Sequence, residues 1–458
     1  MQFLVLLGVL AMVTSSLAAG RDIGVGKLQE VLAWKQLSYD LGDVGTSPRY
    51  LNLQPGDVSD SIVSFPDEFA PGNTTAPAPA EANNEPTEGG QNNNFFIPYN
   101  NVPMGVDRWK NKLFITVPRR RTGIPATLNY VEIPTGENSN KSPGLRPYPD
   151  LQTNTLVAAF TGEYTPLVNI YRTTVDVCDR LWFVDIGTLE IPGNFQAIQP
   201  PALVIYDLKT DTLLRRYLLR SEDMVNDNPV GFASVTVDVD ASDCANAFAY
   251  LPDLATYGVV VYSLKEDTSW RVRHNYFYLD PEEGDFNLNG IRFSWNDGVF
   301  SIALGGVNPD GFRTAYFHAM ASQRERAVST AVLRNETSAT RSYHDTDFKQ
   351  IGNRGPNSQT TMHAVHHESR VMFGAMVGSS ALWCWNTRKD LNPRNLGIVA
   401  KDAVNFMYPS DLKIEKDNIW IMTNRLPMFI YSTLNPEEVN FRLYKVKVQD
   451  AIKGTVCA

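Results

Sequence analysis

Six copies of one short pattern recur along the chain between residues 105 and 431. Each copy has an apolar strand, a turn, a second strand rich in aromatic residues, and a third strand that often ends near a tyrosine. The copies begin at Gly105, Thr174, Ser234, Asn289, Thr361 and Ser410. A single copy cannot bury both of its faces, whereas copies arranged in a ring bury them against each other. The repeat therefore predicts an all-β protein, a six-bladed β-propeller.

Three segments complete this prediction. We assign Asn289–Phe293 as the first strand of the fourth copy and Met428–Tyr431 as the last strand of the sixth. The apolar run Val31–Leu37 lies far from the other copies in sequence and is expected to supply the outer strand of the sixth blade. That pairing would close the ring and remove its open sheet edges.

The N-terminus has the pattern of a cleaved signal peptide. Phe3–Val13 is an apolar run of 11 residues, about half of what a membrane-spanning helix needs. Small residues follow it, with Ser16 and Ala18 at the −3 and −1 positions of a cleavage site, although no Lys or Arg precedes the run. We expect residues 1–18 to be removed and the protein to be secreted to the extracellular space. No later segment is long and apolar enough to predict a membrane partner.

Composition divides the remainder of the chain. We predict an N-terminal segment that closes the propeller over 19–54, a low-complexity acidic insertion over 55–94, and the propeller itself over 95–458. Residues 50–107 contain no Lys or Arg but eight carboxylates. The formal net charge of −9 argues against nucleic acid as a partner.

The cysteines and sequons agree with secretion. The four cysteines are Cys178, Cys244, Cys384 and Cys457. No pair has the CxxC spacing of zinc or redox sites, so an even number in an oxidising compartment predicts two disulfides with three possible connectivities. The sequons at Asn73, Asn140 and Asn335 predict glycosylation.

Several sequence phrases resemble the insect yellow and major royal jelly protein family. They include Val117-Pro118-Arg119-Arg120-Arg121, Asp179-Arg180-Leu181-Trp182-Phe183-Val184-Asp185, Arg354-Gly355-Pro356-Asn357-Ser358 and Asn424-Arg425-Leu426-Pro427. The resemblance keeps its order from about Lys27 to Cys457. The insertion before Phe95 looks longer than is usual for the yellow protein, and that protein's long C-terminal tail is absent. The resemblance thus indicates a yellow-like paralogue.

The resemblance implies a secreted six-bladed propeller from a family linked to cuticle melanisation. Some members are similar to dopachrome-conversion enzymes of an isomerase or tautomerase type, and some salivary relatives bind biogenic amines. The implied partner is a small catechol or amine, with association of the protein with the cuticle. By the same resemblance, Cys178 is expected to pair with Cys244, and Cys384 with Cys457.

Propeller geometry suggests where such a ligand would bind. The first strand of each blade lines the axis, and the loops after the second strands surround one mouth, where polar groups converge. Rim candidates are Arg119, Asp185, Asp253, Asn308, Ser379 and Asn424. Candidates on the first strands are Asp107, Thr174, Ser234, Asn289, His363 and Ser410.

For dopachrome conversion, Asp253 or His363 would be the catalytic base and Arg119 the donor that stabilises an oxygen. An amine would need acceptors and an aromatic face. These are offered by Asp185, Asp253, Ser410 and Asn424, and by the rings of Phe195, Tyr257 and Phe406. The amine-binding relatives use a hydroxyl and an amide from the last blade, which the resemblance places at Ser410 and Asn424. The alternative is that each Asp or Asn at a strand end caps a turn.

Metal and cofactor sites are not predicted. On a strand, His363 and His367 would face one way and His366 the other, so the three do not suit one ion. A calcium-dependent hydrolase built on Asp185, Asp253 and Asn424 would lack a fourth ligand. No nucleophile elbow or phosphate-binding loop indicates an organic cofactor. The run 119–121 would either meet an anion, such as a substrate carboxylate, or form a solvated turn with one structural arginine.

Overall fold

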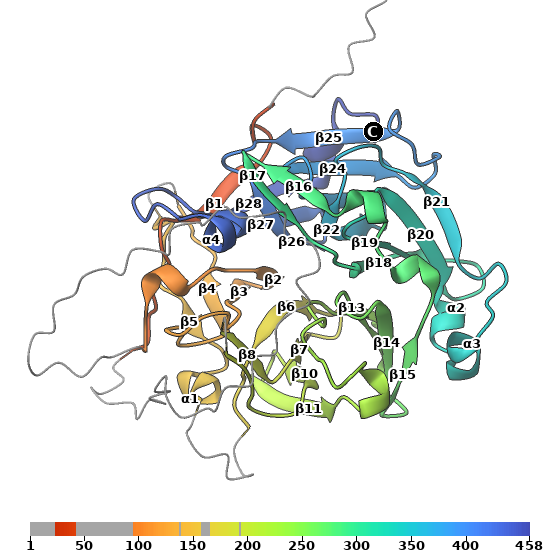
Figure 1. Ribbon diagram of the computed structural model, residues 1–458, viewed down its shortest axis with the longest axis horizontal. Helices are drawn as coiled ribbons and strands as arrows, with labels where there is room; N and C mark the ends of the chain where they lie inside the picture. The colour runs from red at the N-terminus through yellow and green to blue at the C-terminus, as the bar shows by residue number, and fades with distance from the viewer. Residues whose placement is uncertain (1–22, 43–94, 137–138, 157–164, 192–193) are drawn as a thin grey trace, which may run out of the picture.

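The computed structural model describes residues 23–42, 95–136, 139–156, 165–191 and 194–458. Over these residues the strands form six four-stranded antiparallel sheets around a central axis (Figure 1). The fold is therefore the predicted six-bladed β-propeller. The expected signal peptide and the whole acidic insertion over 55–94 lie outside the described residues. Among those residues, none of the helices has the length and apolar character of a membrane-spanning segment.

The blades follow one another along the chain, and the first strand named in each lies at the axis. Blade 1 comprises β2 (Gly105–Trp109), β3 (Lys112–Thr116), β4 (Leu128–Glu132) and β5 (Arg146–Pro147). Blade 2 comprises β6 (Ile170–Val175), β7 (Arg180–Asp185), β10 (Ala202–Asp207) and β11 (Thr212–Leu218). Blade 3 comprises β12 (Thr236–Asp240), β13 (Asp243–Asp253), β14 (Gly258–Ser263) and β15 (Thr268–Val272).

The second half of the ring repeats this order. Blade 4 comprises β18 (Val299–Val307), β19 (Arg313–Ala319), β20 (Arg324–Ser329) and β21 (Lys349–Asn353). Blade 5 comprises β22 (Thr360–His366), β23 (Val371–Met376), β24 (Ala381–Asn386) and β25 (Leu396–Lys401). Blade 6 comprises β26 (Tyr408–Glu415), β27 (Asn418–Asn424), β28 (Phe441–Lys447) and β1 (Gln29–Trp34).

Short elements decorate the blades. Two hairpins are formed by β8 (Thr188–Ile191) with β9 (Asn194–Ala197), and by β16 (Asp285–Leu288) with β17 (Ile291–Ser294). The helices are α1 (Leu151–Asn154), α2 (Thr330–Leu333), α3 (Glu336–Thr340), α4 (Leu426–Tyr431) and α5 (Val448–Ile452). Single 3-10 turns span Pro98–Asn100, Ser221–Asp223, Asn275–Phe277 and Pro281–Glu283.

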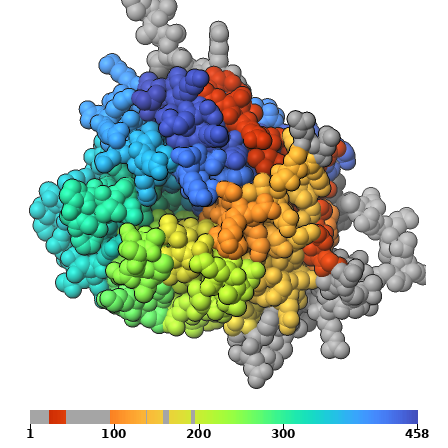
Figure 2. Space-filling model, turned by 180° about the vertical axis from the view of Figure 1, so that it is seen from behind, coloured from red at the N-terminus to blue at the C-terminus, as the bar shows by residue number. Residues whose placement is uncertain are grey.

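The ring is closed by strands from the two ends of the chain. β1 pairs antiparallel with β28, and Ala33 lies opposite Arg442. Residues 23–42, in red, lie between the C-terminal segments in blue and blade 1 in orange (Figure 2). Trp34 in β1 is fully buried, and its indole donates a hydrogen bond to the carbonyl of Pro143 at 2.9 Å. The outer strand expected near residues 31–37 is therefore present, and it shields the edge of blade 6.

Hydroxyl groups near the axis link each blade to the next. Five donate to a backbone carbonyl of the following blade, and the hydroxyl of Ser301 meets the imidazole of His363. The five donor–acceptor pairs are Thr116–Tyr171, Thr174–Val235, Ser234–Phe300, Thr361–Pro409 and Ser410–Met104. Such a bond contributes about 1 kcal/mol net, so the set stabilises the ring at its narrowest part. Three of the first-strand candidates, at 174, 234 and 410, are used in this way.

Two predicted strands are wrong. Asn289 and Gly290 have positive φ values of 50° and 87° and form the two-residue turn of the hairpin β16–β17, a position typical of Asn-Gly. Phe293 therefore belongs to the hairpin, and β18 is the axial strand of blade 4. Residues 428–431 lie in α4, which begins at Leu426; Pro427 is tolerated in its first turn, and the apolar side of the helix is buried. The third strand of blade 6 is β28 instead.

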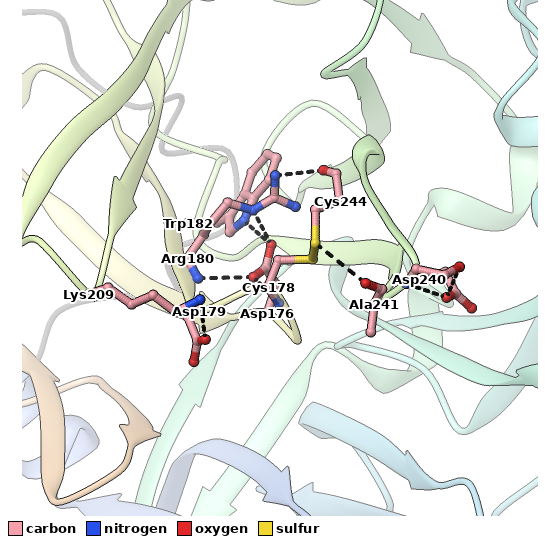
Figure 3. Close-up of a disulfide and its surroundings, with 10 residues drawn as sticks. Asp176, Cys178, Asp179, Arg180, Trp182, Lys209, Asp240, Ala241 and Cys244 are labelled. Atoms are coloured by element: carbon pink, nitrogen blue, oxygen red, sulfur yellow. Dashed lines mark hydrogen bonds and ion pairs between the residues drawn. A yellow bond between two sulfur atoms is a disulfide. The ribbon is translucent and has the colours of Figure 1, made fainter.

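Both disulfides have the expected pairing. Cys178 bonds to Cys244 and ties the β6–β7 turn of blade 2 to β13 of blade 3 (Figure 3). Beside this bridge, Arg180 binds the carboxylate of Asp176 at 2.6 Å and the carbonyl of Cys244 at 2.7 Å. Cys384 in β24 bonds to Cys457 beyond α5, so the C-terminus is fastened to blade 5.

Candidate active site

Asp185 and Asp253, two of the predicted rim residues, end the second strands of blades 2 and 3 and are fully buried. The carboxylate of Asp185 accepts hydrogen bonds from the N–H groups of Val168 and Asn169, both at 2.9 Å. That of Asp253 pairs with Arg271 at 2.8 Å and accepts bonds from the turn that follows β13. Asp185 also accepts the N–H of Gly187 at 3.0 Å, so both carboxylates cap the turn that follows their strand, as the alternative predicted.

Arg119 is buried in the loop between β3 and β4. Its guanidinium donates to backbone carbonyls of three surrounding segments. The acceptors are Ile124, Pro125, Asn154, Leu167 and Val168, at 2.6–3.1 Å. The geometry thus places Arg119 as a link between loops of blades 1 and 2, with its donors directed at the backbone.

The predicted ligand-binding residues of blade 6 also have internal partners. Ser410 provides the link to blade 1 described above. The amide of Asn424 donates to the carbonyl of Pro103 at 2.8 Å and accepts the N–H of Leu426 at 2.9 Å. Phe406 is fully buried in the main hydrophobic core. Ser410 and Asn424 therefore join blade 6 to blade 1, and Asn424 also contacts the start of α4.

His363 belongs to a fully buried cluster between blades 4 and 5. Its Nε2 lies 3.2 Å from one oxygen of Glu325, whose other oxygen lies 3.0 Å from Nδ1 of His318 and accepts from Arg354 at 2.6 Å. Burial acts to raise the pKa of the Glu325 carboxyl, but the two histidines outweigh it and hold this pKa well below its usual range. The spacing would suit a cation, but the guanidinium of Arg354 already neutralises this carboxylate.

The other histidines of the 363–367 run lie elsewhere. Nε2 of His366 is 3.3 Å from the carboxylate of Asp417, whereas Nε2 of His367 is 3.0 Å from the carbonyl of Leu304. The three imidazoles therefore do not share one centre.

Two of the three predicted glycosylation sites lie on the described surface. Asn140 is exposed, and Asn335 is exposed at the N-cap of α3, where its Oδ1 accepts from Ser338. Asn73 falls outside the described residues. Glycosylation at all three remains a prediction.

The mouth at which the axial strands begin carries polar groups that the sequence reasoning did not select. Asp297 lies between β17 and β18, partly exposed, and its carboxylate makes no hydrogen bond or ion pair with any described residue. Burial raises the pKa of this carboxyl to about 6, although Arg120 and Arg172 act to lower it. A free carboxylate with a pKa near neutrality is suited to proton transfer.

Arg120 and Arg121 follow the buried arginine but take different places. Arg121 lies on α4, with its guanidinium 4.0 Å from the ring centroid of Phe429. Arg120 instead donates from Nε to the hydroxyl of Tyr171 at 3.0 Å. That hydroxyl donates in turn to the carboxylate of Glu190 at 2.5 Å. The guanidinium of Arg120 is thereby held near the axial mouth, within electrostatic range of the Asp297 carboxylate.

Aromatic rings from different elements form a wall beside Asp297. The indole N–H of Trp295 donates to the hydroxyl of Tyr431 in α4 at 2.6 Å. The same indole lies edge-on to Tyr408 of β26, with centroids 5.8 Å apart. Phe293 stacks on Tyr431 at 5.0 Å, in agreement with the adjacent positions of β17 and α4 in Figure 1. This wall offers a flat apolar contact for a small ring system.

Tyr408 and Arg172 lie at the axis near Asp297. Arg172 is buried, and its guanidinium donates twice to the carbonyl of Ser410, at 2.9 and 2.7 Å. Burial raises the pKa of the Tyr408 hydroxyl to about 12, against the opposing effect of Arg172. At neutral pH this hydroxyl is therefore protonated and able to donate a hydrogen bond.

The sequence contained part of this signal. The run 119–121 suggested either an anion contact or a solvated turn with one structural arginine; Arg119 has the contacts of a structural arginine, and an anion contact stays a prediction. Asp297 was overlooked because the fourth blade was started at Asn289, which left Trp295 and Asp297 in a turn within the blade. A correct start at residue 299 would have placed both of them at the axial mouth.

Comparison with known proteins identifies the family. The sequence profile described as "Major royal jelly protein" matches residues 168–457. The chain belongs to the major royal jelly protein family. It is 43% identical over 370 residues to L-dopachrome tautomerase yellow-f of Drosophila melanogaster, covering 81% of this chain and 85% of that protein.

Other relatives of this royal jelly family member carry the name yellow. Protein yellow of Drosophila erecta is 40% identical over 366 residues, which are 79% of this chain but only 65% of that protein's length. The resemblance seen in the sequence phrases is therefore confirmed. Among solved structures, the PQQ-bound aldose sugar dehydrogenase of Streptomyces coelicolor gives a TM-score of 0.39 at 11% identity, covering 76% of this chain and 94% of that one.

Proposed function

We propose that this chain is a secreted yellow-family enzyme of cuticle pigmentation that converts L-dopachrome in melanin formation. The observation that carries the proposal is the carboxylate of Asp297, which has no partner among the described residues and a pKa raised to about 6 by burial. The similarity to a protein named L-dopachrome tautomerase supports the choice of substrate. The two disulfides support secretion, because such bonds persist in oxidising compartments.

Conversion of dopachrome to its dihydroxyindole tautomer moves two protons from the saturated ring carbons to the two quinone oxygens, with no net gain or loss of electrons. In the proposed reaction, the Asp297 carboxylate accepts the first proton from carbon while one quinone oxygen gains a proton, and Asp297 then releases its proton to solvent; loss of the second carbon proton and protonation of the other oxygen complete the reaction. A general base is most effective when its pKa lies near the working pH, because it is then both deprotonated and basic. Ordinary aspartates are too acidic for this role, so burial at the axial mouth gives Asp297 the required basicity.

The oxygen that gains electron density needs a hydrogen-bond donor. Tyr408 is the proposed donor, since its hydroxyl stays protonated at neutral pH and lies beside the guanidinium of Arg172. The flat bicyclic ring of dopachrome would pack on Trp295 and Tyr431. In this scheme Asp253, His363 and Arg119 support the fold around the site, and the proton transfer falls to Asp297.

The test is the loss of dopachrome colour, measured against its spontaneous rate. Purified wild-type protein should accelerate it, and Asp297→Asn should reduce that acceleration at least about 100-fold. Glu282→Gln is the matched control, because Glu282 is an exposed carboxylate on the same connection between blades 3 and 4. A wild-type protein that leaves the spontaneous rate unchanged would refute the proposed activity.

The same mouth also suits a non-catalytic role. A free carboxylate beside aromatic rings would hold the ammonium group of dopamine or serotonin by charge and by cation–π contact. Calorimetry with both amines separates the two functions. Heat of binding without dopachrome turnover supports an amine carrier, whereas no heat with either amine removes this alternative.

A further inference from the structure

Arg120 is fixed at one end and free at the other. Its Nε donates to Tyr171 at 3.0 Å, and its guanidinium lies 5.1 Å from the centroid of that ring. Its two terminal nitrogens have no hydrogen-bond partner among the described residues, and the side chain is partly exposed. This guanidinium therefore presents two parallel N–H donors to the mouth, the geometry that binds a carboxylate bidentately.

A short chain of hydrogen bonds holds this orientation. Tyr171 is buried, accepts the bond from Arg120, and donates to Glu190 at 2.5 Å. The other oxygen of Glu190 accepts from the amide of Asn169 at 3.4 Å. Burial raises the pKa of the Glu190 carboxyl, while the charge of Arg120 acts to lower it. Glu190 is thus directed at Tyr171, and the terminal N–H groups of Arg120 remain available for a ligand.

The charges across the mouth are separated rather than paired. Arg120 and Asp297 influence each other electrostatically, yet they form no ion pair in the described part of the chain. Arg172, the other cation that acts on Asp297, is already bound to the carbonyls of Ser410 and Ala233. Of these two arginines, only Arg120 has both terminal nitrogens without a hydrogen-bond partner in the described part of the chain.

We infer that Arg120 binds the carboxylate of the substrate, and that Tyr171 and Glu190 are positioning residues for it. The site therefore selects aminochromes that carry a carboxylate, such as L-dopachrome, over decarboxylated ones such as dopaminechrome. This inference rests on the proposed function for the reaction, but the anion contact can be tested without turnover.

The first experiment compares kcat/KM for L-dopachrome and dopaminechrome in four proteins. Wild type should prefer L-dopachrome by about 10- to 100-fold, the usual effect of a charge-assisted contact. Arg120→Gln should remove this preference, mainly through KM for L-dopachrome, with a clearly smaller loss of kcat/KM for dopaminechrome. Tyr171→Phe should give an intermediate loss, again only for the carboxylated substrate. Arg388→Gln, which removes an exposed arginine of blade 5, should behave as wild type.

An equal loss for both substrates in Arg120→Gln, or a preference that survives it, would overturn the inference and leave the proposed activity standing. If wild type turns over neither substrate, the proposed activity is refuted, and the carboxylate contact at Arg120 is then tested by binding measurements alone. Calorimetry should then show that indole-2-carboxylate binds wild type at least about tenfold tighter than indole, and that Arg120→Gln abolishes the difference. Equal affinities of wild type for the two probes would refute a carboxylate contact at Arg120.

Discussion

Removal of the bridge between Cys384 and Cys457 tests how the C-terminus is held in the ring. Cys384 lies in the third strand of blade 5 and is fully buried, and Cys457 follows α5 at the end of the chain. The ring itself is closed by the pairing of β1 with β28, which the substitution leaves in place. The double variant Cys384→Ala/Cys457→Ala should therefore fold, with lower stability.

The size of the effect follows from the length of the loop. The two cysteines are 73 residues apart, and closing such a loop in the unfolded chain corresponds to about 4.4 kcal/mol at 25 °C. Unfolding entropies of about 2.1 cal/mol/K per residue give about 0.9 kcal/mol/K for the roughly 440 residues that remain after the expected removal of residues 1–18. The ratio predicts a fall in Tm of about 4 to 5 °C. Loss of buried packing around Cys384 should add about 1 °C or more.

The other bridge is the matched control. Cys178 and Cys244 are 66 residues apart, so the loop-closure term differs by only about 0.1 kcal/mol. Thermal scans at one fixed rate, with urea unfolding as a second measure, should show similar losses for Cys178→Ala/Cys244→Ala. A fall in Tm below about 1 °C for the C-terminal bridge, with a large fall for the other, would refute the chain-entropy reasoning.

The single variant Cys457→Ala gives a further measurement on the same bridge. The thiol of Cys384 is then free but still covered, so a reagent reaches it only when the segment after β28 opens. Mass spectrometry should show slow labelling of Cys384, while Cys178 and Cys244 stay bonded to each other.

Three further predictions concern single residues. The kcat/KM for dopachrome should fall about tenfold per pH unit below pH 6 and should level off above pH 6. The reason is that Asp297 acts as a base only when ionised, and its pKa is raised to about 6. A flat pH profile would contradict this role. Arg119→Ala should lower the free energy of unfolding by about 3 kcal/mol or more in urea titrations, since buried carbonyls lose a charged donor, whereas Arg120→Ala should cost less than about 1 kcal/mol. Gly397→Ala should destabilise the protein, because the added Cβ would lie 2.8 and 2.9 Å from the two sulfur atoms of the C-terminal bridge. An unchanged Tm would show that the surrounding residues move to accommodate the added methyl group.

The propeller could be predicted from the sequence because a repeated unit indicates how the copies pack against one another. Six similar units can bury their faces only against each other, so the number of copies determined the architecture before any contact was known. The two wrong strands arose where local chemistry competes with the repeat. At Asn289-Gly290 the turn preference was overlooked, and at residues 428–431 a short apolar run fitted a strand and a helix equally well.

The candidate site was less predictable because residue type does not reveal which partner a side chain finds. Asp185, Asp253 and Asp297 all lie in segments at one mouth of the propeller. Whether such a carboxylate is free depends on which N–H groups lie within about 3 Å of it, and this is decided by loops from neighbouring blades. The arginine run gives a second example. The guanidinium of Arg119 donates to backbone carbonyls, whereas that of its neighbour Arg120 lies near the axial mouth.

The contrast between two of these aspartates gives a last test of the site. Burial raises the pKa of Asp297 to about 6 from 3.8, so ionisation of Asp297 lowers the free energy of unfolding. The shift corresponds to a cost of about 3 kcal/mol at most, and of about 1 to 2 kcal/mol for a partly exposed group. This cost is complete above the folded pKa and disappears below the unfolded value near pH 4. Asp297→Asn should therefore be more stable than wild type at pH 7.5 and equal to it near pH 4, in urea titrations at both pH values. Asp253→Asn should lose about 3 kcal/mol or more at pH 7.5, because the buried guanidinium of Arg271 would lose its counter-charge. If Asp297→Asn were instead destabilised at pH 7.5, its carboxylate would have a stabilising partner and would not be held free for catalysis.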